Sequence, residues 1–387
     1  MKYFLLVILL CSCARAPLKS INESMRLAEN PPVLKDDLGS ENFFKTLRHH
    51  IDVMKTSRFV SDPMTFGPKK ISKSSYIAAL EEIFNHPDDW VDYISINFNF
   101  YEVYGKDDWA EVMSTGYYEP IVKGSKTKTE VFSQALYSTP KDLMSVDFKK
   151  FADKFSKGEK LPILTGRIEN KSFVPYYDRK AIDSDLKLKN QNLELAWVSP
   201  VDSFFIQIQG SGTVEFQDGE KIRYGYASQN GHPYFALGKS LTDVIPLQEM
   251  SMQRIKLHLE TLTHEQQQSI LNKNPSYVFF KKLDGGALTY AGMEVSDGRT
   301  IATDLQLFPK GAMAFLDISE PVFDSDVSIT PKEWRPVPRV VFDQDTGGAI
   351  KGGGRMDLYY GSGVEAAQKA GVMKQHGKLY YLVPRSL

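Results

Sequence analysis

The chain contains almost no cysteine. Of its 387 residues two are cysteines, Cys11 and Cys13, and both lie at the extreme N-terminus. A chain cleaved there would hold no intramolecular disulfide and no thiol nucleophile. This excludes a disulfide-stabilised scaffold and a cysteine-dependent enzyme.

An excess of charge of one sign is also missing. The chain has 47 lysine and arginine residues against 48 aspartate and glutamate residues, a formal net charge of −1. Without a basic surplus, no global field attracts nucleic acid or an anionic membrane surface. We therefore expect no nucleic-acid partner, and a neutral polymer or a small molecule fits better as the ligand.

Long apolar runs are absent beyond the N-terminal sequence FLLVILLCSC. This run is too short for a permanent transmembrane helix, and one lysine precedes it, which is typical of an export signal. The residues LCS before Cys13 resemble a bacterial lipobox, in which the cysteine is lipidated. We predict a signal peptide over 1–12 and a lipidated tether over 13–29, with a plain secretory signal as the alternative. Ala14 after the cysteine favours the periplasmic face of the outer membrane of a Gram-negative type cell.

Apolar patterns predict a mainly β protein with peripheral helices. A length of 387 residues exceeds what one core usually organises, so we expect two domains. The segments WVDYISINFNFYEVYG (90–105) and AEVMSTGYYEPIV (110–122) are rich in aromatic and β-branched residues and predict strands. Three- and four-residue apolar spacing or capping residues predict helices over 44–54, 77–84, 247–262, 263–271 and 364–370.

The stretch FDQDTGGAIKGGGRMDLYYGSG (342–363) carries three aspartates among many glycines. A phosphate loop needs lysine directly after its last glycine, and Lys351 follows Ile350 instead. The GxGxxA at 361–366 lacks the complete βαβ unit of a dinucleotide site. The chain has no HExxH, no cysteine cluster and no GxSxG, which argues against zinc and serine-nucleophile chemistry. A calcium site at the aspartates stays open, although their spacing is not that of an EF-hand.

Acid chemistry is the remaining interpretation of this stretch. RMDLYY alternates as a strand does, which places Asp357 on one face with Arg355 and Tyr359. Burial and a neighbouring carboxylate such as Asp345 could keep Asp357 protonated, and it could then act as a general acid. The alternative is that Asp345 and Asp357 only accept turn or cap hydrogen bonds.

The sequences QDTGGAIKG, RMDLYYGSGVEAAQKAG and GKLYYLVP resemble the C-terminal signature of the membrane-bound lytic murein transglycosylase A (MltA) family. Four further blocks keep the family's order over most of the chain. They are TGYYEPIVKGS (115–125), DSFFIQIQGSGTVEF (202–216), YASQNGHPYFALG (226–238) and NPSYVFF (274–280).

The resemblance implies a double-psi β-barrel domain built from 30–119 and 281–387, a second β-domain inserted over 120–280, and a substrate groove between them. The family's C-terminal module is known for three aspartates, which fall here on Asp304, Asp345 and Asp357. The resemblance makes Asp357 the catalytic acid, and we assign Asp345 a supporting catalytic role.

The activity implied is that of a peptidoglycan lytic exotransglycosylase. Such an enzyme cleaves the β-1,4 bond between N-acetylmuramic acid and N-acetylglucosamine and leaves 1,6-anhydromuramic acid ends. No metal or organic cofactor is required. The expected partners are peptidoglycan glycan strands, the membrane through the lipid anchor and proteins of cell-wall synthesis or hydrolysis, and we expect a monomer. A non-catalytic wall-binding lipoprotein and a hydrolytic glycosidase on a related barrel are the alternatives.

Several further residues are candidates for binding the glycan. If FFIQIQG is a strand, Gln207 and Gln209 share a face next to Ser211, and their amides suit sugar hydroxyls and acetamides. Tyr117 could stack on a sugar ring, and Lys351 and Arg355 could meet lactyl or peptide carboxylates. Asp304 is also a candidate for binding the glycan. The alternatives are solvent-facing glutamines, a tyrosine in the core, surface ion pairs, and a structural role for Asp304.

Overall fold

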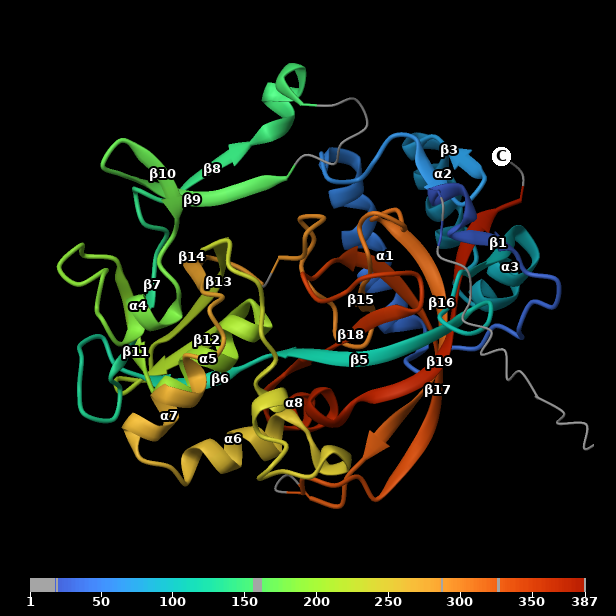
Figure 1. Ribbon diagram of the computed structural model, residues 1–387. Coiled ribbons are helices and arrows are strands. Elements are labelled where there is room, and N and C mark those ends of the chain that lie inside the picture. The colour runs from blue at the N-terminus through green and yellow to red at the C-terminus, as the bar shows by residue number, and fades with distance from the viewer. Residues whose placement is uncertain (1–17, 19, 156–161, 287, 326–327, 386–387) are drawn as a thin grey trace, which may run out of the picture.

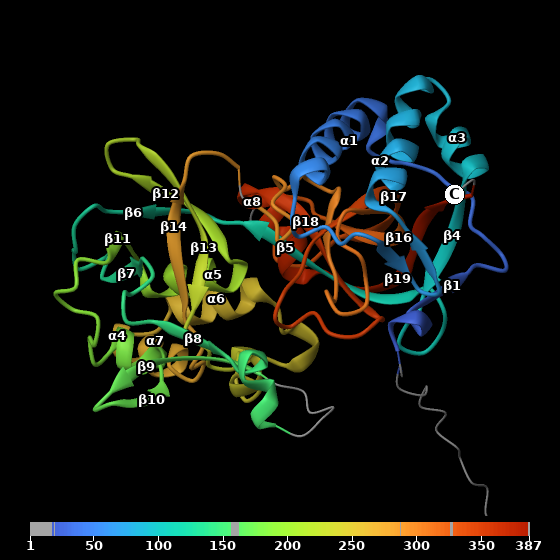
Figure 2. The same ribbon diagram turned by 90° about the horizontal axis from the view of Figure 1, so that it is seen from above.

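The computed structural model describes residue 18 and residues 20–155, 162–286, 288–325 and 328–385. The predicted signal peptide and the lipidation site Cys13 lie outside these residues. Two bodies lie side by side, and the long strand β5 (Glu111–Glu119) runs from one toward the other (Figures 1 and 2). One is built on a closed barrel and the other on small sheets, so the predicted mainly β class is confirmed.

Six strands form the closed barrel. Their order is β19-β16-β17-β15-β18-β5, and β5 pairs again with β19, which leaves no open edge within the ring. The pairs β18–β5 and β15–β17 are parallel and the others are antiparallel. With β5, the barrel strands are β15 (Thr300–Ala302), β16 (Ala312–Val322), β17 (Glu333–Asp345), β18 (Arg355–Ser362) and β19 (Lys374–Pro384).

Helices and short strands from the N-terminal third cover the barrel. Strands β4 (Phe98–Val103) and β1 (Met25–Leu27) extend the sheet beyond β19, and β2 (Met64–Phe66) pairs with β3 (Lys69–Ile71). Helix α1 (Gly39–Thr56) buries apolar residues at the predicted spacing, and α2 (Lys73–Glu82) begins at a Ser72 cap, which confirms both helices. Helix α8 (Gly363–Val372) follows β18, as predicted, and contacts β5.

The strand predicted over 90–105 is wrong in its first half. Residues Trp90–Asn97 form helix α3, and only Phe98–Val103 is the strand β4. Trp90 and Ile94, one helical turn apart, are both buried, and the Trp90 ring stacks on Phe43 with 4.0 Å between ring centroids. Packing of one helical face against α1 therefore outweighs the β propensity of the segment.

The second body has three small sheets. A four-stranded sheet has the order β14-β13-β12-β6, a three-stranded one β10-β9-β8, and β11 pairs with β7. The strands are β6 (Ile121–Gly124), β7 (Gln134–Tyr137), β8 (Met144–Asp147), β9 (Ile163–Glu169), β10 (Ser172–Pro175), β11 (Glu194–Val198), β12 (Ser211–Phe216), β13 (Lys221–Gln229) and β14 (Val278–Leu283). Its helices are α4 (Arg179–Asp183), α5 (Pro200–Gln209), α6 (Met252–Glu260) and α7 (His264–Leu271); α6 and α7 confirm the two helices predicted there.

The strand predicted for FFIQIQG is wrong, because the segment lies in α5. Ser199 caps this helix by accepting a hydrogen bond from the backbone of Asp202, and Pro200 stands at its first turn. Gly210 ends it with φ of +78°. A serine cap followed by proline is a signal for the start of a helix, and a glycine after the last turn is a signal for its end. Together these signals could have predicted the helix.

A buried polar contact joins the two bodies where β5 ends. The Glu119 carboxylate is 2% exposed and accepts hydrogen bonds from Thr213 Oγ1 at 2.8 Å and Arg223 Nε at 2.6 Å. Both donors belong to the small-sheet body, on β12 and β13, so this contact fixes where the chain leaves the barrel. Within the described residues, no helix has the length and apolarity needed to cross a bilayer.

Candidate active site

Strand register brings two of the three predicted aspartates to one place on the barrel. Ala302 on β15 pairs with Asp345 on β17 along one edge and with Asp357 on β18 along the other. Two strand spacings put the Cα atoms of the aspartates about 10 Å apart. Residues twelve positions apart in sequence thus flank one alanine.

Strand β5 contacts both carboxylates from a single face. Thr115 and Tyr117 lie two residues apart, so their side chains point the same way about 7 Å apart. The Thr115 hydroxyl donates to Oδ1 of Asp357, and the Tyr117 hydroxyl donates to Oδ2 of Asp345 at 3.2 Å. The two aspartates therefore face the same side of the barrel wall.

The surroundings of Asp357 suit an acid that must hold a proton. Its side chain is 20% exposed, and burial raises the pKa of the carboxyl above its ordinary value. The Arg355 guanidinium, with Nη2 3.3 Å from Oδ1, and the Thr115 hydroxyl oppose that rise in pKa. Asp357 is thus a desolvated carboxyl with donors on one oxygen. Of the two causes expected from the sequence, burial raises the pKa, and the neighbouring carboxylate of Asp345 is not among the causes.

Asp345 is held more firmly than Asp357. Its Oδ1 accepts hydrogen bonds from the backbone N–H groups of Tyr290 and Thr346, each at 2.9 Å. Burial raises the pKa of Asp345, and these two N–H groups oppose the rise. Burial also raises the pKa of Tyr117 well above its ordinary value, so its hydroxyl stays protonated as a donor. Asp345 is a fixed carboxyl on the same side of the barrel wall as Asp357.

Asp304 uses both carboxylate oxygens inside the protein. Oδ1 accepts from the backbone N–H of Gln306 at 3.0 Å, and Oδ2 accepts from the backbone N–H of Gly352 at 2.8 Å. Its residue exposure is 5%. These contacts fasten the glycine-rich loop between β17 and β18 to the turn after β15, which favours the structural alternative for Asp304.

At two positions of this loop the backbone conformation or the close packing requires glycine. Gly352, whose N–H is held by Asp304, has φ of +86°, where a side chain would be strained. A Cβ on Gly353 would lie 2.1 Å from the backbone oxygen of Tyr104. At that position the glycine permits close packing against the loop after β4, rather than space for a ligand.

An ion pair that the sequence did not indicate lies in the barrel core beside the site. The Lys310 ammonium contacts Asp343 Oδ1 at 2.7 Å, and both side chains are fully buried. Asp343 Oδ2 also accepts from Thr303 Oγ1 at 2.6 Å and from the Tyr381 hydroxyl. Lys310, Thr303 and Tyr381 together satisfy the Asp343 carboxylate within the protein. Asp343, one of the aspartates considered for a calcium site, therefore already has protein groups on both oxygens. No residue near Lys310 in the sequence signals this partner.

The remaining candidate binding residues do not gather at the aspartates. Gln207 is 5% exposed, and its amide oxygen accepts from Arg179 Nη2 at 2.9 Å, which ties α5 to α4. Gln209 accepts from the backbone N–H of Tyr118 at 3.2 Å, next to the β5 site. Ser211 begins β12 and is half-buried, and Lys351 is exposed on the glycine-rich loop. Burial therefore argues against a sugar contact for Gln207, whereas a sugar contact remains open for Gln209, Ser211 and Lys351.

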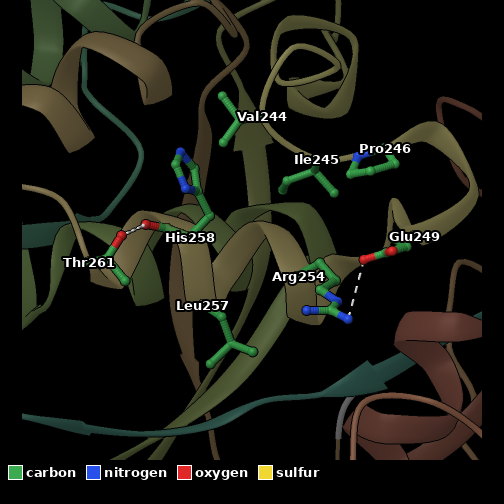
Figure 3. Close-up of a pocket in the computed structure, with 8 residues that line it drawn as sticks. All are labelled: Val244, Ile245, Pro246, Glu249, Arg254, Leu257, His258 and Thr261. Carbon is green, nitrogen blue, oxygen red and sulfur yellow. Dashed lines mark hydrogen bonds and ion pairs between the residues drawn. The ribbon is translucent and has the colours of Figure 1, made fainter.

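A surface pocket of about 260 Å³ lies elsewhere, at α6 and the segment before it. Figure 3 shows Arg254 paired with Glu249 at 3.3 Å on one side of it and the side chains of Ile245 and His258 nearby. None of the predicted site residues lines this pocket. Within the described parts of the chain, no three His, Cys, Asp or Glu side chains are grouped as metal ligands would be.

Known proteins share both the domains and the fold. Residues 113–281 match the MltA specific insert domain, and residues 299–383 match the 3D domain. The membrane-bound lytic murein transglycosylase A of Escherichia coli K12 is 27% identical over 330 residues, 83% of this chain and 78% of that protein.

Solved structures give the same result. The membrane-bound lytic murein transglycosylase of Agrobacterium tumefaciens is 26% identical with a TM-score of 0.74, over 94% of this chain and 98% of that one. E. coli MltA with bound chitohexaose, at 22% identity, shares the fold with a TM-score of 0.70 over 94% and 96% of the two chains. With the two domain matches and the closed barrel, these similarities show that the chain belongs to the MltA family of lytic murein transglycosylases.

Proposed function

We propose that this protein is a lytic transglycosylase that cleaves the β-1,4 bond between N-acetylmuramic acid and N-acetylglucosamine in peptidoglycan. The observation that carries the proposal is Asp357, a desolvated carboxyl with a raised pKa on a strand of the family's barrel. A carboxyl with a raised pKa keeps its proton to higher pH than an ordinary aspartate does, and protonation of a glycosidic oxygen requires such a proton.

In the first step Asp357 acts as the general acid. Its proton passes to the glycosidic oxygen, the bond from C1 to that oxygen breaks, and the electron pair leaves with the oxygen. An oxocarbenium-like centre develops at C1 of the muramoyl residue. Asp345, fixed by two backbone N–H groups, supplies negative charge close by and stabilises this centre.

In the second step the same carboxyl acts as a base. The ionised Asp357 removes the proton from the muramoyl 6-hydroxyl, whose oxygen attacks C1 and closes the 1,6-anhydro ring. The Thr115 hydroxyl and the Arg355 guanidinium stabilise the anion between the steps. The nucleophile belongs to the substrate, so one carboxylate suffices where a hydrolase uses two.

We place the enzyme on the periplasmic face of the outer membrane, held by lipid on Cys13. The relatives named membrane-bound support association with a membrane, and the lipobox-like LCS before Cys13 supports the lipid. We also propose that 30–119 with 281–387 and 120–280 fold as separate domains. Glu119 at the end of β5 supports the first limit, and near the second limit the strand β14 (Val278–Leu283) still pairs with β13 of the small-sheet body through Leu283.

Digestion of purified peptidoglycan followed by mass spectrometry tests the function. We expect 1,6-anhydromuramoyl ends, whose mass is one water lower than that of reducing ends. Reducing ends would mean a hydrolase on this barrel, and uncut strands that still retain the protein would mean a wall-binding lipoprotein. Analysis of short and long products in the same digest distinguishes action at chain ends from internal cleavage.

A further inference from the structure

Arg355, Thr115 and Asp357 form a directed chain of contacts on one face of the barrel wall. Asp357 on β18 pairs with Thr115 on the parallel strand β5, and Arg355 lies two residues before Asp357 on the same face. Arg355 Nη2 donates to Thr115 Oγ1 at 2.7 Å, and Thr115 in turn donates to Asp357 Oδ1. These contacts join residues 240 positions apart in the sequence.

The direction of this chain follows from the chemistry of its members. A guanidinium can only donate, whereas a hydroxyl has one proton and can accept on its lone pairs. The Thr115 oxygen must therefore turn a lone pair toward Arg355. Asp357 Oδ1 is the one acceptor within hydrogen-bond distance of that hydroxyl among the residues that the structure describes. With Oδ1 as its acceptor, the Thr115 proton points to Oδ1.

A proton on Oδ1 is disfavoured for a second reason. Arg355 Nη2 lies 3.3 Å from Oδ1, so a positive charge faces this oxygen directly. Oδ1 thus receives a hydroxyl donor and faces a guanidinium. In the protonated carboxyl, Oδ1 is then the carbonyl oxygen and Oδ2 carries the hydrogen. Oδ2 accepts no hydrogen bond from any described residue.

We propose that Arg355 is a positioning residue, which orients the Thr115 hydroxyl so that the acid proton of Asp357 stays on Oδ2, the oxygen free to meet the glycosidic bond. This inference rests on the proposed role of Asp357 as the general acid. It replaces the expected contact of Arg355 with a substrate carboxylate by a role inside the site. Without the chain of contacts, the proton is shared between both oxygens, and turnover falls while substrate binding persists.

Kinetics on purified peptidoglycan strands separate these roles. Thr115→Val keeps the shape of threonine but removes the hydroxyl, and we expect it to lower kcat at least about tenfold with little change in KM. Thr115→Ser, which restores the hydroxyl, should return kcat to within about threefold of wild type. Arg355→Met should lower kcat in the same way, and Arg355→Lys, which can also only donate, should retain most of it.

The double variant is the decisive measurement. If Arg355 acts through Thr115, then Arg355→Met should cost little further kcat once Thr115→Val is present. Equal effects of Arg355→Met in both backgrounds would overturn the proposal, as would a rise in KM without loss of kcat, which indicates a substrate carboxylate contact. If circular dichroism shows that a variant with Arg355→Met does not fold, the comparison of Thr115→Val, Thr115→Ser and Arg355→Lys decides alone. The proposed chain of contacts is rejected if Thr115→Ser is as slow as Thr115→Val. It is also rejected if Arg355→Lys is slowed as much as Thr115→Val.

The pH profile gives a readout that a merely structural role would not move. Arg355 and Thr115 both oppose the raised pKa of Asp357. Their loss should raise it further, so the alkaline limb of the kcat profile, where the acid loses its proton, should move to higher pH in Thr115→Val and Arg355→Met. An unmoved limb rejects the proposal. Failure of the acid role of Asp357 is distinct, because Asp357→Asn would then still release anhydro products. Failure of the function itself is also distinct, because the wild type would then release reducing ends or no products.

Discussion

The Tyr117 hydroxyl donates a hydrogen bond to Oδ2 of Asp345 at 3.2 Å, across 228 positions of the sequence. The same strand carries Thr115, which bonds Asp357, so β5 determines how the two carboxylates are placed relative to each other. This strand also leads directly into the small-sheet body through Glu119. Asp357 and Asp345 are thus connected to the second body by one continuous strand.

For Asp345→Asn we expect a fold that survives and a turnover that falls about ten- to a hundredfold. The asparagine oxygen can still accept from the backbone of Tyr290 and Thr346, and Tyr117 can accept from the new amide. The negative charge near C1 is lost. Initial rates of anhydro product release across the pH range, with Tyr117→Phe as a control for the hydrogen bond alone, measure the effect. Wild-type rates at every pH would make Asp345 structural.

Asp357→Asn should abolish nearly all release of anhydro product while the protein still folds and binds strands. Asparagine keeps the shape and can accept from Thr115, but it has no proton to transfer. General acid catalysis is worth about a hundred- to ten-thousandfold, and a group that serves both steps should lie at or beyond the upper end. Rates by mass spectrometry and co-sedimentation with peptidoglycan test both halves.

Asp317→Asn is the matched control for this variant. Asp317 is an exposed aspartate on the barrel strand β16, outside the site. It should keep wild-type turnover. If Asp357→Asn retained even a tenth of wild-type turnover, the acid would have to be sought elsewhere, first at Asp345 and then at Asp304.

Cys13→Ser should leave the protein unacylated and release it from the membrane fraction. The three residues before Cys13 fit a lipobox, whereas Cys11 follows the bulky Leu10. Metabolic labelling with a fatty acid, followed by separation of inner and outer membranes, measures the lipid and its location. Cys11→Ser is the control and should stay acylated. Persistent labelling of Cys13→Ser would disprove the assignment.

His50 should make the protein less stable as the pH falls from about 6.5 to about 4. Its ring is buried: Nε2 donates to the Gly311 carbonyl at 3.0 Å, and Nδ1 accepts from Gln344 at 2.8 Å. Burial lowers the pKa of His50 from 6.5 to about 4. In this window the unfolded chain binds a proton that the folded chain does not, so the free energy of unfolding falls with pH, by about 3 kcal/mol in all.

Denaturant unfolding at several pH values between 7 and 4 measures this contribution. His50→Gln can still donate to Gly311 and accept from Gln344 but does not titrate, so its stability should depend less on pH than that of wild type. His264→Gln, at an exposed histidine on α7, should keep the wild-type slope. Parallel pH curves for wild type and His50→Gln would show that His50 contributes nothing.

Local sequence determined most of the secondary structure around the site. The alternation of RMDLYY is sufficient to place Asp357 and Arg355 on one face of a strand, since side chains of a strand point alternately to its two sides. The amphipathic spacing of α1 and the caps of α2 and α7 are likewise local. The family resemblance supplied the closed barrel, because strand order depends on pairs that no local pattern encodes.

Tertiary structure alone decided which groups surround each aspartate. Thr115 reaches Asp357, and Lys310 neutralises Asp343, only because the barrel closes and brings distant strands into register. The same closure removes water from Asp357, and this burial is the main cause of its raised pKa. It also buried Gln207 in a helix against Arg179, where alternation alone suggested an exposed strand face. Burial and non-local contact depend on the whole fold, so the sequence indicated Asp357 as the candidate acid, and only the closed barrel determined the burial that raises its pKa.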